Sequence, residues 1–378
     1  MNKVDFYRHE LGAEELAQVG EVLSSVFLTT GPKTAEFERR FSEYLNVPHT
    51  SGVTSCTTAL LLALKAYDIG EGDEVITTPM TFIASANAIL HAGAKPVFVD
   101  VEAATGNLDV SRVEAAISPR TKAVLAVHLY GQMCDMRALK ALAEKHNLAL
   151  IEDCAHAAES QRDGVGPGQL GDVACFSFYA TKNITCGEGG AISTRHAEIA
   201  DRIKTLRLHG MSKAAYDRYT GTYKHWDMLA LGYKANMCDL QAALLLPQLG
   251  KIEQRLAQRE ELCRLYDELL AGVPGISTPQ KQPNSKLARH LYTVWVAATR
   301  RDEILGRLQE AGIGVAVNFR AIHLLSYYQQ QFGFQRGAFP NAERIGDSTI
   351  TLPLYPSLQA DAVRYVAQSL IEIVRTPK

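Results

Sequence analysis

The feature of this sequence that most restricts its fold is a regular alternation of strand-like and helix-like segments that begins at residue 73. The strand-like stretches DEVITTP, KPVFVD, TKAVLAV and LALIED are separated by helical patterns from about Phe82 to His91, from Asp109, and through Ala138 to His146. Such alternation is typical of βαβ units, which place parallel strands in one sheet. Because VLAV and LALI are apolar on both faces, helices should cover both sides of that sheet. The sequence therefore predicts an α/β core.

The pattern changes after Asp153. Two short strand-like stretches, VACFSFY and GGAIST, follow, so we expect a mixed sheet. A long helical stretch then begins near Asp239, should be interrupted by Pro247, and runs to Gly272 as a connector. Beyond it, strands LYTVWVAAT and GVAVNF alternate with helices DEILGRLQEAG and DAVRYVAQSLIEIV, a separate α+β pattern.

The chain length, 378 residues, suits two domains. We place a large α/β domain at residues 1–245 and a smaller C-terminal α+β domain at residues 246–378. With 39 basic and 41 acidic side chains, and no basic run, nucleic acid is not an expected partner. The seven cysteines form no CxxC pair and are expected to be reduced thiols. With no signal peptide or membrane span, the sequence predicts a cytoplasmic protein with no membrane partner.

Lys182 is the most informative residue of the chain. It lies in SFYATKNITCGEGGAIS, after a strand-like stretch and before a glycine cluster at Gly187, Gly189 and Gly190. Taken alone, it would be interpreted as a surface lysine, since most lysines are exposed. Pyridoxal 5'-phosphate (PLP) offers another reason for it: an amine must be uncharged to form an imine, and desolvation lowers a lysine pKa toward that state. The glycines would let the backbone pass close to a bulky cofactor.

Asp153 ends the stretch LALIED, so we expect its carboxylate at the carboxyl edge of the sheet, where α/β proteins bind ligands. A carboxylate there can pair with a pyridine nitrogen, and a protonated nitrogen makes the ring an electron sink. The competing interpretation is an aspartate that caps a turn, and without Lys182 it is the better one. His156 by itself is more typical of a structural residue.

The segment TSCTTALLLALKAY has a polar start and a helical apolar pattern, which predict a helix N-terminus at Ser55 to Thr58. The helix dipole and the free N–H groups of Cys56 and Thr57 would hold a phosphate dianion. On this segment alone, a simple N-cap is the better interpretation. Ser177, five residues before Lys182, would offer a hydroxyl to the same phosphate.

Asp153, Ser177 and Lys182, in the motifs IEDCAHA, SFYATK and GEGG, together resemble the DegT/DnrJ/EryC1/StrS family of sugar aminotransferases. The resemblance covers nearly the whole chain through LTTGPKTAEFERRF, TSCTTAL, TPMTFIASANAIL, VHLYGQ, LRLHG, LGYKANMCDLQAAL and TLPLYP. It implies a fold type I PLP-dependent transferase with a mixed, mostly parallel sheet in its large domain. It also implies a homodimer with shared active sites.

The resemblance further implies roles for single residues. Lys182 matches the catalytic lysine that forms a Schiff base with PLP, Asp153 the acid at the pyridine nitrogen, and Phe82 the aromatic stacked on the ring. His156 stands beside the ring, where relatives often have Gln.

The phosphate end of the cofactor is matched by Thr57 and Ser177. Cys56 stands in the same segment, where relatives usually have Gly. Lys234, in LGYKANM, matches the position from which the neighbouring subunit reaches the phosphate.

The substrate contacts implied by the resemblance are Asn318, which replaces a frequent histidine in VNFRAIH, and His323, which matches a later histidine near the sugar pocket. No metal is expected. The implied reaction moves nitrogen from L-glutamate to a nucleotide-linked keto-sugar. The opening VFLTTGPKTAEFE looks most like members that aminate C4 of UDP-linked 4-keto-6-deoxy-hexosamines. Arg320 is the nearest candidate for a carboxylate-binding arginine, but it lies in the sugar-pocket segment.

Several alternatives remain open or are opposed by single residues. The amine could go to C3 of the sugar. A non-catalytic regulatory or binding protein on the same scaffold is opposed by the intact lysine, acid and phosphate segment. Relatives that dehydrate C3 replace the lysine by histidine, so Lys182 argues against them. An NAD-dependent enzyme is opposed because GxGxxG at Gly166, Gly168 and Gly171 contains Pro167, follows no strand and precedes no helix.

Overall fold

The computed structural model describes residues 3–212 and 225–376. Its centre is a seven-stranded sheet in the order β1 (His49–Val53), β8 (Gly190–Thr194), β7 (Val173–Ser177), β5 (Ala149–Asp153), β4 (Thr121–Val127), β2 (Glu74–Thr77) and β3 (Lys95–Phe98). Strand β8 pairs antiparallel with both of its neighbours, and every other neighbouring pair is parallel. The prediction of an α/β fold with a mixed, mostly parallel sheet is therefore confirmed.

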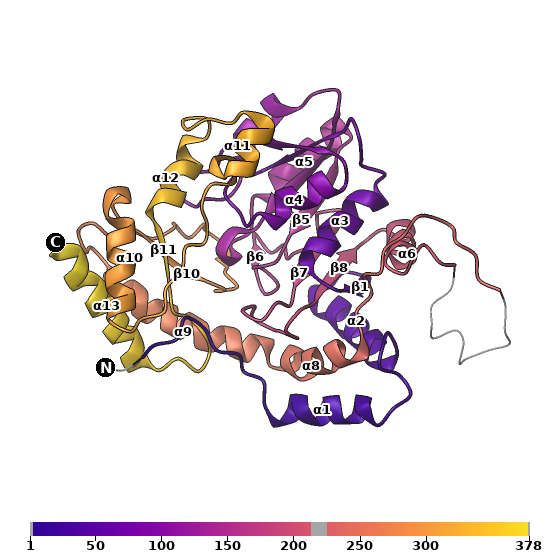
Figure 1. Cartoon of the computed structure of the whole chain (residues 1–378), viewed down its shortest axis with the longest axis horizontal. Helices are drawn as coiled ribbons and strands as arrows, with labels where there is room; N and C mark the ends of the chain where they lie inside the picture. Colours follow the sequence, from indigo (N-terminus) through magenta and orange to yellow (C-terminus); the bar gives the residue numbers. More distant parts are fainter. Residues whose placement is uncertain (1–2, 213–224, 377–378) are drawn as a thin grey trace.

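Helices cover both faces of this sheet (Figure 1). One face packs against α3 (Cys56–Ala66), α4 (Ala84–His91) and α6 (Ala197–Leu206), and the other against α2 (Pro32–Leu45), α5 (Met136–His146) and α8 (Asp239–Gly250). Successive strand residues alternate between the two layers: Ile151 packs with α3, and Leu150 packs with α5. Each fully buried side chain of this size contributes about 1.5–3 kcal/mol, so the doubly apolar strands require both layers.

The C-terminal part of the chain has its own core. Strand β10 (Tyr292–Trp295) pairs antiparallel with β11 (Thr349–Leu352), and α9 (Ile252–Leu270), α10 (Arg301–Glu310) and α13 (Ala360–Arg375) pack around them. Val4 belongs to the same core, because its N–H and C=O bond to the backbone of Gly312 and Gly314. The two ends of the chain accordingly lie on the same side of the molecule (Figure 1).

The connection between the two cores runs through α8 and α9. The expected interruption at Pro247 is wrong: Pro247 lies inside α8, and the break comes at Lys251. Contacts of α8 with α1 (Ala13–Leu23) and α2 outweigh the loss of one helical hydrogen bond at the proline. Ile252 still packs in the first core and Leu262 in the second. Packing thus changes within α9, between Ile252 and Leu262, whereas we proposed the boundary at residue 245.

Two further expectations differ from the structure. The helix expected from Asp109 is a pair of short 3-10 turns, η1 (Val110–Arg112) and η2 (Glu114–Ala116). The stretch GVAVNF is not a strand and makes one isolated bridge, from Ala316 to Thr351. The end of this stretch borders a cavity, so it does not continue a ladder.

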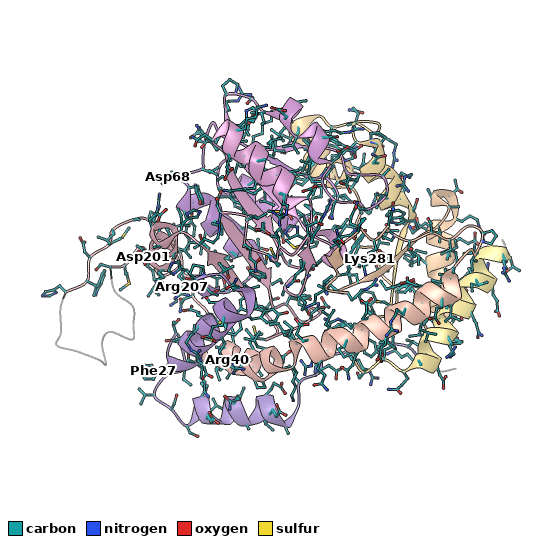
Figure 2. The ribbon with its side chains drawn as sticks, turned by 180° about the vertical axis from the view of Figure 1, so that it is seen from behind. Phe27, Arg40, Asp68, Asp201, Arg207 and Lys281 are labelled. Atoms are coloured by element: carbon teal, nitrogen blue, oxygen red, sulfur yellow. The ribbon has the colours of Figure 1, made fainter. Side chains whose placement is uncertain are left out.

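Short elements complete the chain: β6 (Gln161–Arg162), β9 (Ser285–Lys286), α11 (Ser326–Phe332), α12 (Pro340–Ser348), η3 (Leu129–Gly131), η4 (Ala298–Arg300) and η5 (Ile322–Leu324). Arg207, labelled in Figure 2, follows α6 and donates to the Gly52 carbonyl at 2.8 Å and to the Glu38 carboxylate, which ties α6 to β1 and α2. None of the seven cysteines is in a disulfide. Within the described ranges, no helix combines the length and apolarity needed to cross a bilayer.

Candidate active site

The candidate site lies at the carboxyl edge of the sheet, where β1, β2, β4, β5 and β7 all end. Loops and helix starts after these strands surround a cavity of about 540 Å³. It is lined by most of the residues that the sequence suggested, namely Cys56, Thr57, Phe82, Asp153, His156, Ser177, Lys182 and Asn318. The parallel strands explain this meeting, because they bring segments far apart in the sequence to one edge.

Lys182 follows β7 in a turn closed by a 2.9 Å hydrogen bond from its own N–H to the Tyr179 carbonyl. Burial lowers the pKa of the Lys182 amine to about 8, although Cys56 and Asp153 act in the opposite direction. The amine can therefore lose its proton near neutral pH, as a lysine that bonds to an aldehyde must.

Asp153 ends β5 and is buried, with both carboxylate oxygens engaged. Ser85 Oγ donates to Asp153 Oδ2 at 2.7 Å, and the Ala155 N–H donates to Oδ1 at 3.1 Å. The Cys56 thiol makes a weaker 3.7 Å contact with Oδ1. These donors fix the orientation of a carboxylate at the cavity wall, where it can accept a further proton donor.

The N-terminus of α3 forms another wall. Ser55 Oγ accepts a 3.1 Å hydrogen bond from the Thr58 N–H, while the first-turn N–H groups of Cys56 and Thr57 have no acceptor inside the helix. A Cβ on Gly190 would lie 2.5 Å from the Ser55 carbonyl carbon, so only glycine lets β8 approach this helix start. With the Ser177 hydroxyl nearby, this wall suits a phosphate group.

Aromatic rings form the opposite side of the cavity. The centroids of Phe82 and Phe319 lie 5.8 Å apart, and the His156 ring stacks on Phe319 at 5.7 Å. Burial, together with Lys182, lowers the pKa of His156 well below its usual range, so this ring is neutral.

Buried polar atoms without a partner line the same space. His156 Nδ1 and Asn318 Oδ1 have no hydrogen-bond partner among the described residues. Buried atoms of this kind are costly unless a ligand or water satisfies them. The residues present therefore fit a bound group that is aromatic, phosphorylated and polar at its rim, as PLP is.

Two expected site residues lie elsewhere. Lys234 is exposed, bridges the backbone of Leu208, and does not line the cavity of its own chain. His323 is fully buried outside the cavity, and its Nε2 lies 2.9 Å from Glu343 Oε1. Because this contact holds His323 in the protein interior, the expectation that it touches a sugar is not supported by its position.

Among the residues that escaped the sequence interpretation, Phe6 and His290 line the cavity, and Ser85 is buried next to Asp153. Ser85 follows Phe82 closely in the motif TPMTFIASANAIL, so it was open to prediction. His290 lies 108 positions from Lys182, and no motif connects the two. Phe6 reaches the cavity only because the N-terminal segment joins the C-terminal core.

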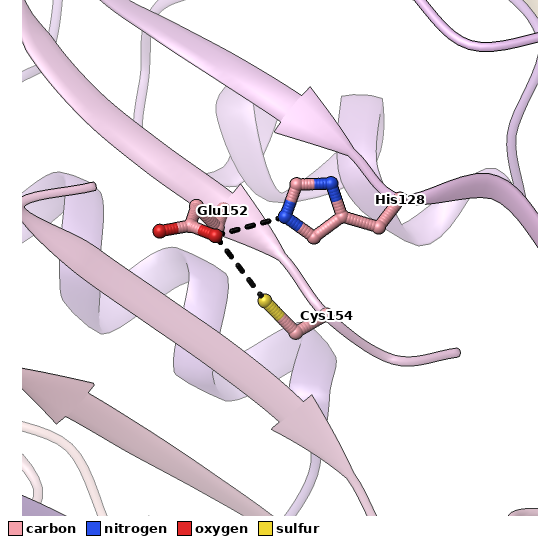
Figure 3. Close-up of side chains that lie close together, drawn as sticks. All are labelled: His128, Glu152 and Cys154. Carbon is pink, nitrogen blue, oxygen red and sulfur yellow. Dashed lines mark hydrogen bonds and ion pairs between the residues drawn. The ribbon is translucent and has the colours of Figure 1, made fainter. Parts of the chain in front are cut away.

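His128, which lines the cavity, forms a compact buried group with Glu152 and Cys154 (Figure 3), and their potential metal-ligand atoms lie within 4.8 Å of one another. Hydrogen bonds explain why these three side chains lie so close together. Glu152 Oε2 lies 2.8 Å from His128 Nε2, and Oε1 accepts two 3.0 Å bonds from N–H groups of the loop before β7. The Cys134 N–H points at His128 Nδ1 at 3.2 Å, so Nε2 carries the proton. The glycine-rich loop thus holds Glu152, and the group joins β4 to β5.

Comparisons with known proteins match nearly the whole chain. Residues 9–371 match the DegT/DnrJ/EryC1/StrS aminotransferase family. The spore coat polysaccharide biosynthesis protein SpsC of Bacillus subtilis (strain 168) is 44% identical over 371 residues, 97% of this chain and 95% of SpsC.

Solved structures agree. DesV of S. venezuelae, in complex with a ketimine intermediate, has a TM-score of 0.92, is 35% identical and matches over 100% of both chains. A Streptococcus pneumoniae protein assigned as a sugar aminotransferase has, in its PLP form, a TM-score of 0.93 and 32% identity over 99% of each chain. The same protein was also solved with pyridoxamine 5'-phosphate (PMP). A match of this length and identity shows that the chain belongs to the DegT/DnrJ/EryC1/StrS family, whose members are sugar aminotransferases.

Proposed function

We propose that this chain uses PLP to transfer an amino group from L-glutamate to a keto-sugar carried on a nucleotide. Within that class we favour C4 of a UDP-linked 4-keto-6-deoxy-hexosamine as the acceptor. The observation that carries the proposal is the Lys182 amine, whose pKa burial lowers to about 8, on one cavity with the oriented Asp153 carboxylate.

The cavity walls have a role for each part of the cofactor. When bound, PLP supplies a protonated ring that withdraws electrons from the carbon that exchanges its proton. Asp153, held by Ser85, would keep a proton on the ring nitrogen. The free N–H groups of Cys56 and Thr57 and the hydroxyl of Ser177 would bind the phosphate.

Lys182 has two tasks in this proposal. Its uncharged amine would hold PLP in the resting enzyme through the aldehyde carbon of the cofactor. Once released, the same amine takes a proton from the amine-bearing carbon of the donor and returns one to the other side of the transferred nitrogen. A pKa of about 8 suits both tasks, because the amine can hold and lose a proton near neutral pH.

Three structural observations and one relative support a sugar acceptor. The cavity volume, about 540 Å³, is in the range of roughly 300–1,000 Å³ typical of small-molecule sites. No arginine, the residue best suited to grip the carboxylate of a 2-oxo acid, is among the described residues that line it, and Arg320 is exposed outside. Asn318 Oδ1 is a free buried acceptor for a hydroxyl group. The relative SpsC, named for spore coat polysaccharide biosynthesis, fits such an acceptor.

The proposal includes a homodimer with shared active sites. Phe82 is 55% and Tyr179 46% exposed although both line the cavity, so one side of the cavity lacks cover within this chain. Exposed apolar side chains also gather just before Lys234, at Trp226, Met228, Leu229 and Leu231. A second copy that covers these surfaces would bring its Lys234 to the phosphate.

Half-reactions test the proposed function. L-glutamate should convert the PLP form of the purified enzyme to the PMP form, with loss of its visible absorbance. A nucleotide-linked keto-sugar should then restore that absorbance. A panel of UDP- and dTDP-linked 3-keto and 4-keto sugars separates C4 from C3 amination. If only 2-oxo acids restore the absorbance, the sugar assignment is wrong. If borohydride does not fix PLP to Lys182, a non-catalytic binding protein becomes the better interpretation.

A further inference from the structure

A row of polar side chains leads from the cavity into the protein interior behind Lys182. Lys182 Nζ lies 3.4 Å from His290 Nε2, and His290 Nδ1 lies 3.1 Å from Asn183 Oδ1. The Asn183 amide donates to both oxygens of Glu159, at 2.9 and 3.0 Å. Arg259 Nη2 donates to Glu159 at 2.7 Å, and both partners of this ion pair are buried. Four residues thus connect to the reactive amine, and three of them, His290, Glu159 and Arg259, lie outside the motifs that predicted the site.

The direction of each hydrogen bond follows from the buried ion pair. A Glu159 carboxylate paired with an arginine can only accept, so the Asn183 nitrogen must face it. The Asn183 oxygen then faces His290, whose Nδ1 must carry the hydrogen. His290 Nε2 is left with a lone pair directed at the Lys182 amine.

The His290 ring stays neutral in this arrangement. Burial, followed by the charges of Lys182, His156 and Arg259, lowers the pKa of His290 well below its usual range. His156 also interacts with Lys182, and its ring is neutral. The other titratable groups that face Lys182 are Cys56 and Asp153. Both act through space and raise the pKa of Lys182, whereas His290 is the side chain within hydrogen-bonding distance of its Nζ.

We infer that His290 is a positioning residue for Lys182: its Nε2 accepts a hydrogen from the amine and so directs the amine, while Asn183, Glu159 and Arg259 fix the His290 tautomer. The role of Lys182 in amino transfer rests on the proposed function, but the contact between the two side chains does not. One hydrogen of the uncharged amine is then directed at His290 Nε2, and the nitrogen lone pair stays free for proton transfer. Lys182 must transfer a proton at the same carbon in every turnover, so an amine held in one orientation favours the reaction.

The test compares two substitutions of the same ring. His290→Leu removes the acceptor, whereas His290→Gln keeps an amide oxygen that can reach the amine. Because an acceptor favours the charged amine, His290→Leu should lower the pKa of Lys182 by about half to one pH unit, and His290→Gln should restore most of this shift.

The measurement uses the full-length protein without PLP. Lys182 is acetylated with acetic anhydride across a pH series, and its peptide is quantified by mass spectrometry, so that the midpoint reports the amine pKa. His323→Leu is the matched control, because His323 is equally buried and bonds to a carboxylate outside the cavity. It should cost comparable stability and leave the Lys182 midpoint unchanged.

Asn183→Ala provides a second route to the same answer if His290→Leu does not fold. It leaves His290 Nδ1 without its fixed partner, so a smaller shift in the same direction is expected. An unchanged midpoint in the folded His290 and Asn183 variants overturns the inference, as does an equal shift in His323→Leu. Since no PLP, glutamate or sugar is present, these outcomes are independent of the half-reactions that test the proposed function.

Discussion

Ser85 Oγ donates a 2.7 Å hydrogen bond to Asp153 Oδ2, and this bond joins the start of α4 to the end of β5. A buried carboxylate can be stabilised in many orientations. Few of these orientations place an oxygen where it can pair with a ring nitrogen at a fixed position. Ser85 selects one, because its hydroxyl holds the oxygen that the Ala155 N–H does not. Ser85 therefore acts on the cavity through Asp153, although it does not line the cavity itself.

Replacing Ser85 with alanine should weaken PLP binding. A hydrogen bond to a charged group contributes about 1.5–3 kcal/mol, so the PLP dissociation constant should rise by roughly tenfold to a hundredfold. Titration of the PLP-free protein, followed by fluorescence or visible absorbance, measures it. Ser111→Ala is a matched control, because Ser111 Oγ donates to the Asp109 carboxylate at 2.6 Å on the exposed surface. If both substitutions raise the PLP dissociation constant equally, Ser85 has no special role in PLP binding.

Asp153 illustrates what the sequence could predict. A doubly apolar stretch that ends in an acid identifies a buried parallel strand and its carboxyl edge, and the structure has β5 ending there. The same reasoning covers Cys56 and Thr57 at a helix start. These positions depend on local patterns, which the sequence carries directly.

Other features depend on contacts between distant segments. Pro247 stays inside α8 because two further helices pack on that helix, and nothing near Pro247 in the sequence announces them. His323 was expected near a sugar, yet it lies in the interior with Glu343 as its partner. His290 reaches Lys182 only after two separate cores have packed together. Such residues have no local signature to predict.

Lys182→Met should stabilise the PLP-free protein at neutral pH. The pKa of Lys182 falls from 10.5 to about 8 on folding because burial disfavours its charge. Below pH 8 the amine is charged in both states, and the folded protein bears the full cost, at most about 3 kcal/mol. Between pH 8 and 10.5 the unfolded chain binds more protons than the folded one, so the cost diminishes as pH rises. Above pH 10.5 the amine is uncharged in both states, so this cost is absent.

Urea unfolding at pH 7 and pH 10, at one protein concentration, measures this difference. The free energy of unfolding of Lys182→Met should clearly exceed that of the natural protein at pH 7 and exceed it only slightly at pH 10. Lys122→Met, at an exposed position in β4, should give no such pH dependence. An advantage that grows with pH would contradict the lowered pKa.

Mixed dimers test the proposed sharing of active sites. Lys182→Ala and Lys234→Ala should each be nearly inactive, because one removes the reacting amine and the other the cation that we propose for the partner's phosphate. After subunit exchange, half of the dimers contain one subunit of each kind, and one of their two sites is intact. Activity should therefore recover to about a quarter of the natural value. No recovery, with exchange verified by mass spectrometry, would indicate that each subunit works alone.

Phe6 is expected to contribute to substrate selection from the N-terminal segment. Val4 fixes this segment to the C-terminal core, and a Cβ on Gly314 would lie 2.5 Å from the Phe6 nitrogen, so the backbone fits closely there. Phe6 itself lines the cavity that holds Lys182. An aromatic ring at the rim can pack on a sugar or nucleotide, and losing it should cost about 1–2 kcal/mol of binding.

Phe6→Ala should therefore raise KM for the nucleotide-linked keto-sugar by roughly fivefold to thirtyfold, while PLP affinity and the glutamate half-reaction stay unchanged. Tyr7→Ala is the matched control, because Tyr7 is the next aromatic of the same segment but does not line this cavity. If both substitutions raise KM equally, the segment acts through its general order and not through the Phe6 ring. If Phe6→Ala slows the glutamate half-reaction as strongly as the sugar half-reaction, Phe6 serves the cofactor region, and selection of the sugar must come from other residues of the cavity.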